Sequence, residues 1–444
     1  MMQKAAFYKT VAELAAAGPE RIPAELISTE HVIYNSPASL AFNSPGAEGF
    51  GVKRAGLAIP GSIMLLVGPG CCGRNTTILS EMSGYSDRFF FYTMDETDII
   101  TSRHLQKIPQ AIREICESSE KAPSVVMVCM TCVDALLGTD MERVCRKAAN
   151  EAGIPVVPCY MYALTREGRK PPMVAVRQAV YSLLKSRKRR GDAVNLLGYF
   201  SPLQDDCELY DLLKQAGVKH IREISRCDDF DEYLAMSEAN FNLVLHAESR
   251  LAAQDMEERL QIPSIELTRM YDTEKIHKQY GIFSKVIGVS LDDRPYKDEA
   301  EATAEEFLKK YGPVRVAIGE MMNGDAFDMA AALSKYGLDV REIYGTVTAE
   351  SFVRLRQLAE TNGSIKVYSN LSPTMLHYKD DESIDLAIGK DAAYYHPKAA
   401  HVFWNQEIQP FGHRGVTTLF HEMTRAMETI EYEGLVEIHI SLCT

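Results

Sequence analysis

Short apolar runs rich in Val, Ile and Leu recur along this chain, and each is followed by a longer stretch with helical periodicity. The runs form three sets: 63–68, 88–94, 124–132 and 154–160; then 193–200, 219–224, 241–246 and 262–267; then 314–319, 338–345, 365–369, 384–389 and 401–405. Such runs suit parallel strands whose sheet is covered by helices on both faces. The sequence therefore predicts an α/β protein with three Rossmann-like, doubly wound parallel-sheet domains.

The length of 444 residues allows two or three domains of ordinary size. The basic run KSRKRRGD at 185–192 is interpreted as a solvated linker that marks the first boundary. We expect four parts: a first α/β domain at 1–190, a second at 191–312, a third at 313–410, and a helical segment at 411–444 that returns to pack on the core.

Charge and cysteine usage exclude several classes of function. The net charge of −13 disfavours a general attraction for nucleic acid or for anionic membranes. No apolar run approaches the roughly 20 residues that a membrane span needs, and the N-terminus has no signal-peptide core, so we expect a cytoplasmic protein. Ten cysteines in such a chain favour thiols, metal ligands or redox centres over a disulfide framework.

The loop GPGCCG follows the first apolar run and has the glycine spacing of a phosphate-binding loop. That motif continues with Lys and then Ser or Thr, but this chain has Arg74 and Asn75. The strand–turn–helix that opens the second set lacks the GxGxxG pattern of dinucleotide binding. Neither an ATPase nor an NAD site is supported.

Two pairs of cysteines follow strands of the first set. Cys71 and Cys72 lie at a predicted helix start, where backbone N–H groups favour a thiolate, and Cys129 and Cys132 are expected in the same setting after the third strand. Loops at one sheet edge would bring the four thiols together. An iron–sulfur cluster is the leading interpretation; a zinc site, a CxxC dithiol and four structural cysteines stay open.

Four segments carry a resemblance to a known family: GPGCC at 68–72, TCVDALLGTD at 131–140, NLVLHAESRLAAQDMEERLQIPSIEL at 242–267 and GHRGVTTLFHEM at 412–423. Their order resembles the nitrogenase component 1-type oxidoreductases, which include the molybdenum–iron protein subunits and the catalytic subunits of the dark-operative protochlorophyllide reductase and the Ni-sirohydrochlorin diamide reductive cyclase. The resemblance covers most of the chain and implies three Rossmann-like domains.

By position, the resemblance implies that Cys72 and Cys132 hold an iron–sulfur cluster, [4Fe–4S] or a larger variant, at a subunit interface. The family's third cysteine falls near Ser44. Cys71 and Cys129 are extra thiols that could replace it, or Ser44 could supply oxygen. Asp95 and Asp98 are further oxygen donors, although an acidic helix start is the simpler account of both.

The cysteine that carries the active-site cofactor of nitrogenase is absent, and His246 occupies its place. Asn405 or Gln406, with His401 nearby, occupies the place of that cofactor's histidine. Dinitrogen reduction is therefore not expected, and the interdomain cleft would hold another metallocluster or a tetrapyrrole substrate. His246 is the candidate proton donor, against the alternative of a satisfied, partly buried histidine.

The resemblance implies a reductase of a small molecule or tetrapyrrole that receives electrons from an ATP-hydrolysing iron protein. A metallocluster assembly scaffold without turnover is the alternative, and a sensor that uses its thiols structurally is the third. A homodimer, or a heterodimer or tetramer with a similar subunit, is expected because the family's clusters lie between subunits. No nucleic acid or membrane partner is expected.

Overall fold

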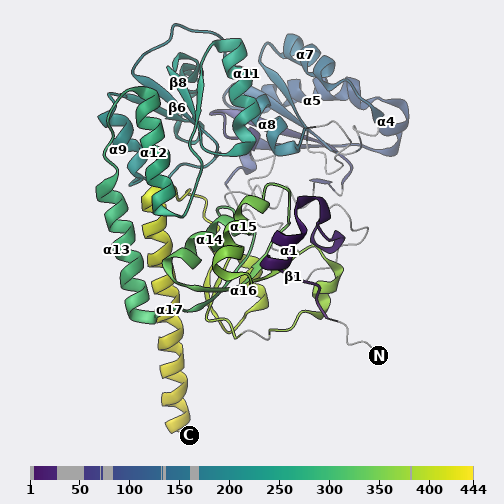
Figure 1. Cartoon of the computed structure of the whole chain (residues 1–444). Helices are drawn as coiled ribbons and strands as arrows, with labels where there is room; N and C mark the ends of the chain where they lie inside the picture. Colours follow the sequence, from purple (N-terminus) through teal and green to yellow (C-terminus); the bar gives the residue numbers. More distant parts are fainter. Residues whose placement is uncertain are drawn as a thin grey trace. The chain divides into compact units, whose positions relative to one another are not determined.

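The computed structural model describes residues 5–27, 55–70, 72–73, 84–131, 133, 137–160, 170–380 and 383–443, with side chains described as far as residue 430. These residues form three sheets flanked by helices (Figure 1). The chain divides into two compact units: unit 1 is Met1–Gly49, Leu203–Ala216 and Arg269–Thr444, and unit 2 is Phe50–Pro202 and Gly217–Thr268. The predicted α/β class with three parallel sheets is confirmed.

Unit 2 contains two four-stranded parallel sheets, sheet B with strand order β3-β2-β4-β5 and sheet C with strand order β7-β6-β8-β9. The strands are β2 (Ser62–Gly68), β3 (Phe89–Thr93), β4 (Val125–Met130), β5 (Val156–Tyr160), β6 (Ala193–Leu197), β7 (His220–Glu223), β8 (Phe241–Val244) and β9 (Ser264–Glu266). Every residue of β2 and β4, the central strands of sheet B, is buried, as expected for strands covered on both faces.

The helices of unit 2 cover sheet B and connect it to sheet C. They are α4 (Glu96–Thr101), α5 (His104–Ser118), α7 (Met141–Ala152), α8 (Pro172–Tyr181), α10 (Phe230–Ala235) and α11 (Arg250–Leu260). Helices α5 and α7 pack on each other and supply side chains to the core on one face of sheet B. Helix α8 contacts both β5 and α11, and one apolar cluster joins the other face of sheet B to sheet C. The expected boundary at 190/191 therefore lies inside one compact unit.

The basic run is exposed from 185 to 191, as a solvated segment should be. Its arginines nevertheless form hydrogen bonds with other residues of unit 2. The Arg189 guanidinium donates a hydrogen bond to the Asn240 side chain (3.0 Å), and the Arg190 backbone N–H donates to the Glu238 carbonyl (2.8 Å). This segment connects the two sheets of a single unit and does not separate two units.

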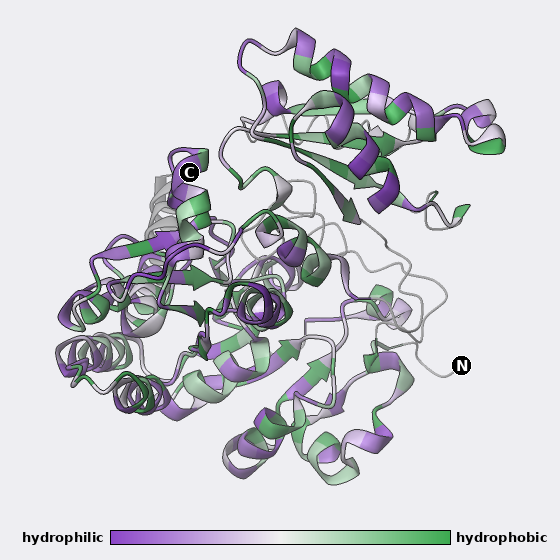
Figure 2. Cartoon of the chain, turned by 90° about the horizontal axis from the view of Figure 1, so that it is seen from above, coloured by the Kyte–Doolittle hydropathy of each residue, from purple (hydrophilic) through white to green (hydrophobic). Residues whose placement is uncertain are grey.

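Unit 1 is built on the six-stranded sheet A, with strand order β1-β12-β11-β10-β13-β14. All neighbouring strands are parallel except β1, which pairs antiparallel with β12. The strands are β1 (Lys9–Thr10), β10 (Arg315–Ile318), β11 (Asp339–Tyr344), β12 (Lys366–Tyr368), β13 (Leu386–Ile388) and β14 (Ala400–Val402). Figure 2 shows that strands are mainly hydrophobic whereas helices carry hydrophilic residues as well.

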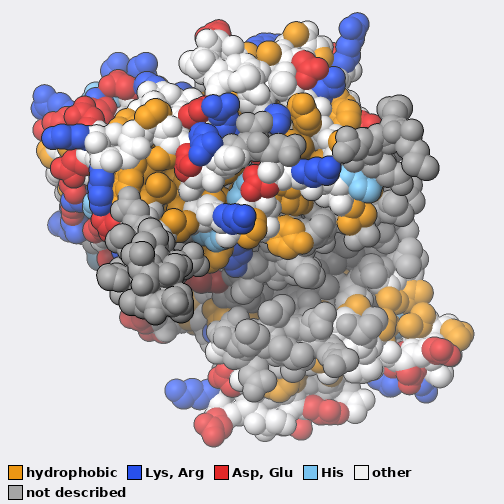
Figure 3. All heavy atoms as spheres, turned by 90° about the horizontal axis from the view of Figure 1, so that it is seen from below, with side chains coloured by type: hydrophobic (Ala, Val, Ile, Leu, Met, Phe, Trp, Pro, Cys, Tyr) orange, Lys and Arg blue, Asp and Glu red, His pale blue; other side chains and the backbone are white. Residues whose placement is uncertain are grey.

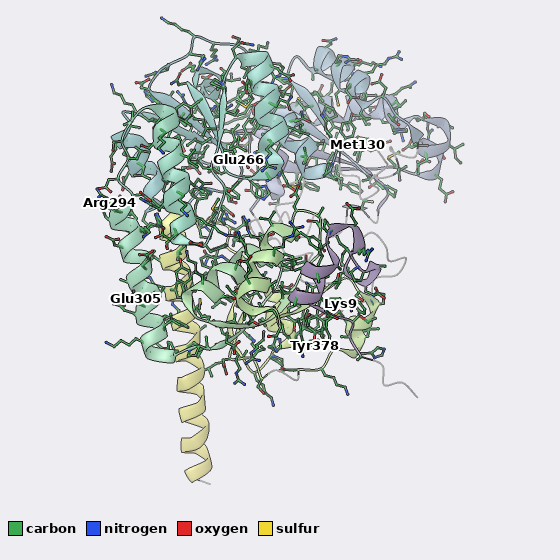
Figure 4. The ribbon with its side chains drawn as sticks, in the orientation of Figure 1. Lys9, Met130, Glu266, Arg294, Glu305 and Tyr378 are labelled. Atoms are coloured by element: carbon green, nitrogen blue, oxygen red, sulfur yellow. The ribbon has the colours of Figure 1, made fainter. Side chains whose placement is uncertain are left out.

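The helices of unit 1 are α1 (Val11–Ala17), α9 (Glu208–Gln215), α12 (Thr273–Ile287), α13 (Arg294–Tyr311), α14 (Ala326–Tyr336), α15 (Phe352–Asn362), α16 (Lys390–Tyr395) and α17 (Gly412–Cys443). Helix α17 is the C-terminal helix that the sequence predicts, and it runs beside α13, on which Arg294 and Glu305 are labelled in Figure 4. The Phe420 ring meets Phe307 and Tyr336 edge-on at 5.8 and 5.3 Å. Aromatic packing thus fixes the first half of α17.

The described surface mixes both signs of charge. On the face shown in Figure 3, Lys and Arg side chains are interspersed with Asp and Glu, and hydrophobic side chains occur between them. Among the described residues, none of the helices combines the length and the apolar character that a membrane crossing requires.

Candidate metal-cluster site

The loop after β2 places Cys72 where the sequence predicts it. The strand ends at Gly68, and the Cys72 backbone N–H donates to the Pro69 carbonyl at 2.9 Å, which closes a turn. Residues 70, 72 and 73 are helical, so Cys72 lies in the first turn of a helix, and it is half-buried. Cys71 lies outside the described residues. The position suits a thiolate, because helix N-termini favour negative charge.

Strands β2 and β4 are adjacent and parallel, with Val67 opposite Met130, which is labelled in Figure 4. The loops that follow the two strands therefore leave from one edge of sheet B. A Cβ on Gly68 would lie only 2.5 Å from the Thr131 Cγ2, so the two loop starts are in close contact. Thr131 is fully buried, and its hydroxyl finds no hydrogen-bond partner among the described residues.

Cys132 directly follows Thr131 but lies outside the described residues, as does Ser44. The described structure thus fixes Gly68, Cys72 and Thr131, whereas the proposed donors Cys71, Cys132 and Ser44 are not placed. In the part of the chain that the structure describes, no three His, Cys, Asp or Glu side chains are grouped closely enough to hold a metal ion. Apart from the position of Cys72 in the loop after β2, the cysteine ligand assignments stay predictions.

Cys129 differs from the expectation. Strand β4 continues to Met130, so Cys129 lies within the strand, opposite Leu66 and Cys159 in the two neighbouring strands. It is fully buried in the apolar cluster that joins sheets B and C. Burial raises the pKa of the adjacent Cys159 thiol well above its usual value, as expected in this apolar core. The placement of Cys129 in a loop was wrong, because strand β4 ends at Met130, one residue beyond it.

Asp95 and Asp98 form a helix start. Asp95 is the N-cap of α4 and accepts the Asp98 backbone N–H at 2.6 Å, and Asp98 accepts the Asp95 N–H in return. Burial alone would raise the pKa of Asp98, but Lys107 at 2.7 Å and the Tyr92 hydroxyl at 2.6 Å hold it at about 2. The simpler account of this pair fits, because both oxygens of Asp98 already have partners.

His246 follows β8 at the carboxyl edge of sheet C. It is the N-cap of η7 (Ala247–Ser249), and its Nδ1 accepts the Glu248 backbone N–H at 3.3 Å. A neutral ring bonded in this way carries its proton on Nε2. The ring lies edge-on to Tyr199 at 5.7 Å, and the side chain is 25% exposed. His246 is thus an oriented, partly accessible histidine in unit 2.

Arg177 is a residue that sequence reasoning missed at this edge. From α8 its guanidinium donates to the Gly198 carbonyl at 2.9 Å, pairs with Glu248 at 2.7 Å and lies 5.0 Å from the centre of the Phe200 ring. It therefore fixes the loops after β6 and β8 against each other. In the sequence Arg177 is visible only as a lone arginine in an apolar helix. Its role can be recognised only once the positions of the loops after β6 and β8 are known.

A cavity of about 740 Å³ opens in unit 2 beside α8. Its lining includes Tyr160, Lys170, Gln178 and Arg259. The Arg259 guanidinium already binds Asp255 at 2.7 Å and the Tyr181 carbonyl at 3.1 Å, and Lys170 donates to Gln178 at 2.7 Å. The cations of this cavity are engaged, so it adds nothing to the candidate site.

A family model described as "Nitrogenase component 1 type Oxidoreductase" matches residues 48–427. The chain belongs to this family. It is 28% identical over 74% of its length to the nitrogenase iron-molybdenum cofactor biosynthesis protein NifE of Rhizobium meliloti (strain 1021), 73% of which is covered. The NifE proteins of Sinorhizobium fredii and Clostridium pasteurianum are 26% and 27% identical, over 65% and 46% of this chain and 60% and 45% of their own lengths.

A solved structure titled "Nitrogenase Cp1 at pH 6.5" has the same fold. It superposes with a TM-score of 0.69 at 16% identity and covers 95% of this chain and 98% of the solved chain. A second structure, "Nitrogenase Cp1 at pH 5", gives a TM-score of 0.61. The resemblance that the sequence carries is thereby confirmed at the level of family and fold.

Proposed function

We propose that this chain is a scaffold that holds an iron–sulfur cluster at the carboxyl edge of sheet B and passes it on without turnover. The observation that carries the proposal is the close contact of Gly68 with Thr131, because each residue directly precedes a cysteine loop. The named relatives are cofactor biosynthesis proteins, which supports the scaffold over the reductase that the sequence alone favoured.

The proposed ligands are Cys72 and Cys132, with Cys71 or Ser44 as a further donor. Thiolates are the usual ligands of a [4Fe–4S] cluster or a larger variant, and the strand-end loops offer them beside backbone N–H groups. Such a cluster takes four protein ligands, so we propose that a second chain, identical or similar, completes the site in a dimer or tetramer. A reducing, cytoplasmic setting belongs to this proposal, because it keeps the thiols available.

A reductase is the second candidate, and the orientation of His246 favours it. The histidine lies at a strand end, where ligands bind in sheets of this kind, and an imidazole can both donate and accept a proton. In this candidate function an ATP-hydrolysing iron protein is the electron donor, and His246 supplies protons to a small molecule or tetrapyrrole. The two functions share the cluster site. A scaffold releases the cluster, whereas a reductase keeps the cluster and releases a reduced product.

Substitution of the cysteines tests the site. We expect Cys72→Ser and Cys132→Ser each to lose most of the iron and sulfide after anaerobic reconstitution of the full chain, because each substitution removes a thiolate, the usual ligand of such clusters. The matched control is Cys116→Ser on α5, which is half-buried like Cys72 and should keep its iron. Cys129→Ser should also keep iron, because this side chain belongs to the core. Wild-type iron content in both Cys72→Ser and Cys132→Ser would refute the proposed site.

A transfer assay separates the two functions. Protein reconstituted with ⁵⁷Fe is mixed under reducing, anaerobic conditions with an apo component 1 protein, and the label is followed by Mössbauer spectroscopy after the two proteins are separated. A scaffold loses its label to the acceptor. A reductase keeps it and consumes electrons when the iron protein and ATP are supplied.

A further inference from the structure

Four strand ends of sheet A converge on two carboxyl groups in unit 1. Glu320 follows β10, Thr346 follows β11, Asn370 follows β12, and Asp391 lies in α16 after β13. The carboxyl edge of a parallel sheet is where ligands bind. Sequence reasoning missed this group, although the acid that follows the apolar run 314–319 is a visible signal.

Asp391 is fixed in place by donors. Its carboxylate accepts the backbone N–H groups of Glu320 at 2.9 Å and Met321 at 3.2 Å, and the Asn370 amide at 2.5 Å. It is fully buried, and a Cβ on Gly319 would overlap it, so only glycine fits at that position. Burial raises the pKa of Asp391, and the three N–H donors oppose that shift because they stabilise the ionised form.

Glu320 stands beside this charge with fewer donors. One oxygen accepts the Thr346 backbone N–H at 2.9 Å, and the other lies 3.3 Å from the Asn370 amide nitrogen that also serves Asp391. Glu320 is partly exposed as a whole residue, whereas Asp391 is fully buried, so Glu320 is the member of the pair nearer to solvent. Asn370 is fully buried, and its carbonyl oxygen has no partner among the described residues. The group therefore retains unused hydrogen-bonding capacity.

We propose that Glu320 and Asp391 are a proton-holding pair, in which neutral Glu320 presents its proton to a ligand at the carboxyl edge of sheet A. The ligand would carry a basic or anionic oxygen, nitrogen or sulfur atom, which an ionised glutamate would repel. In the transfer, the Glu320 O–H bond breaks, its proton bonds to the ligand, and the electron pair stays on the carboxylate. A hydronium ion from bulk solvent then reprotonates Glu320 and leaves neutral water. The pair is in unit 1, so the inference does not depend on the cluster site.

The electrostatics agree with this geometry. Burial, and then the charge of Asp391, raise the pKa of Glu320 to about 7, while the Thr346 and Asn370 hydrogen bonds oppose the shift. Asp391 is the charged group that faces Glu320 across the sheet edge. Lys390 directly precedes Asp391, and the Lys390 backbone N–H lies 3.5 Å from the Met321 carbonyl oxygen. A glutamic acid that titrates near neutral pH at a strand end is suited to general acid chemistry.

Infrared titration of the full chain tests the pair. Between pH 5 and pH 9 we expect the wild type to lose one protonated-carboxyl band with a midpoint near pH 7. Glu320→Gln should lack this transition, whereas Glu360→Gln, which removes an exposed carboxyl on α15, should keep it. Asp391→Asn should move the midpoint to lower pH, because the neighbouring charge is gone. Prompt exchange of the proton in D₂O should show that solvent reaches it.

Folding is checked by circular dichroism, and Glu320→Gln should fold because glutamine matches the shape of the neutral acid. The proposal is overturned if the wild type binds no such proton or if Glu320→Gln retains the transition. It is also overturned if the proton exchanges only when the protein unfolds, because a sealed proton cannot be presented to a ligand. A purely structural pair would give ordinary carboxyl titration and a destabilised Glu320→Gln.

Discussion

Replacing Gly412 with alanine is expected to lower the free energy of unfolding of unit 1 by about 3 kcal/mol or more. Gly412 starts α17 with φ at +64°, where an L side chain is strained. An added Cβ would overlap the Glu208 carboxylate and lie 2.7 Å from the Tyr280 hydroxyl. These groups cannot move at low cost, because both are buried and bonded to each other at 3.0 Å.

The Glu208 carboxylate also caps the start of α17. Glu208 accepts the backbone N–H groups of His413 at 2.5 Å and Arg414 at 3.1 Å, so moving it leaves two helix donors and a buried carboxyl unsatisfied. Trp404 is the only tryptophan and is buried in unit 1, so its fluorescence during urea unfolding measures this effect.

The matched control for Gly412 is Gly281→Ala in α12. An added Cβ there meets nothing within 4 Å, so we expect a gain of about 0.5–1 kcal/mol from helix propensity. Equal, small effects of both substitutions would contradict the role assigned to the Gly412 turn.

Replacing Gly68 with alanine is expected to destabilise unit 2 by about 1–3 kcal/mol and to reduce the iron bound after reconstitution. The new methyl group would lie 2.5 Å from the Thr131 Cγ2, and the β-branched Thr131 is fully buried, so one loop must shift. On the proposed function, a shift of either loop would disturb the ligand pair Cys72 and Cys132. Far-ultraviolet circular dichroism in urea and iron analysis measure the two consequences.

A second substitution distinguishes this mechanism from general damage. In Gly68→Ala/Thr131→Ala the clashing Cγ2 is removed and the Thr131 Cβ, 3.3 Å away, remains, so both stability and iron should recover in part. The control Gly70→Ala lies in the same loop, where a Cβ meets only the Thr93 Cγ2 at 4.0 Å, and its stability should change by less than about 0.5 kcal/mol. Failure of the double variant to recover would show that the loop contact does not govern the site.

Much of the site was open to prediction because strand ends are local features of an α/β sequence. The apolar runs at 63–68 and 124–132 become β2 and β4, and parallel pairing places the residues after them at one edge. The end of strand β4 was misplaced, because an apolar run that contains cysteine does not show where strand pairing stops. Cys129 accordingly moved from the loop to the core.

The other site groups depend on partners that are distant in the chain. Glu320 and Asp391 are 71 positions apart, and the Arg177 guanidinium reaches a carbonyl 21 positions away together with Glu248. Neither pairing follows from local pattern, because each arises where loops from different strands meet. The same holds for β1, which joins sheet A from the far end of the chain.

The sequence by itself determined the α/β class, the approximate strand positions and the family, because these follow from short-range apolar periodicity and from the order of motifs along the chain. Only the tertiary structure decided that sheets B and C share one core, that Cys129 is inside it, and that Glu320 stands beside Asp391. The physical reason is that burial and electrostatic environment are set by side chains from distant segments, which no local pattern specifies.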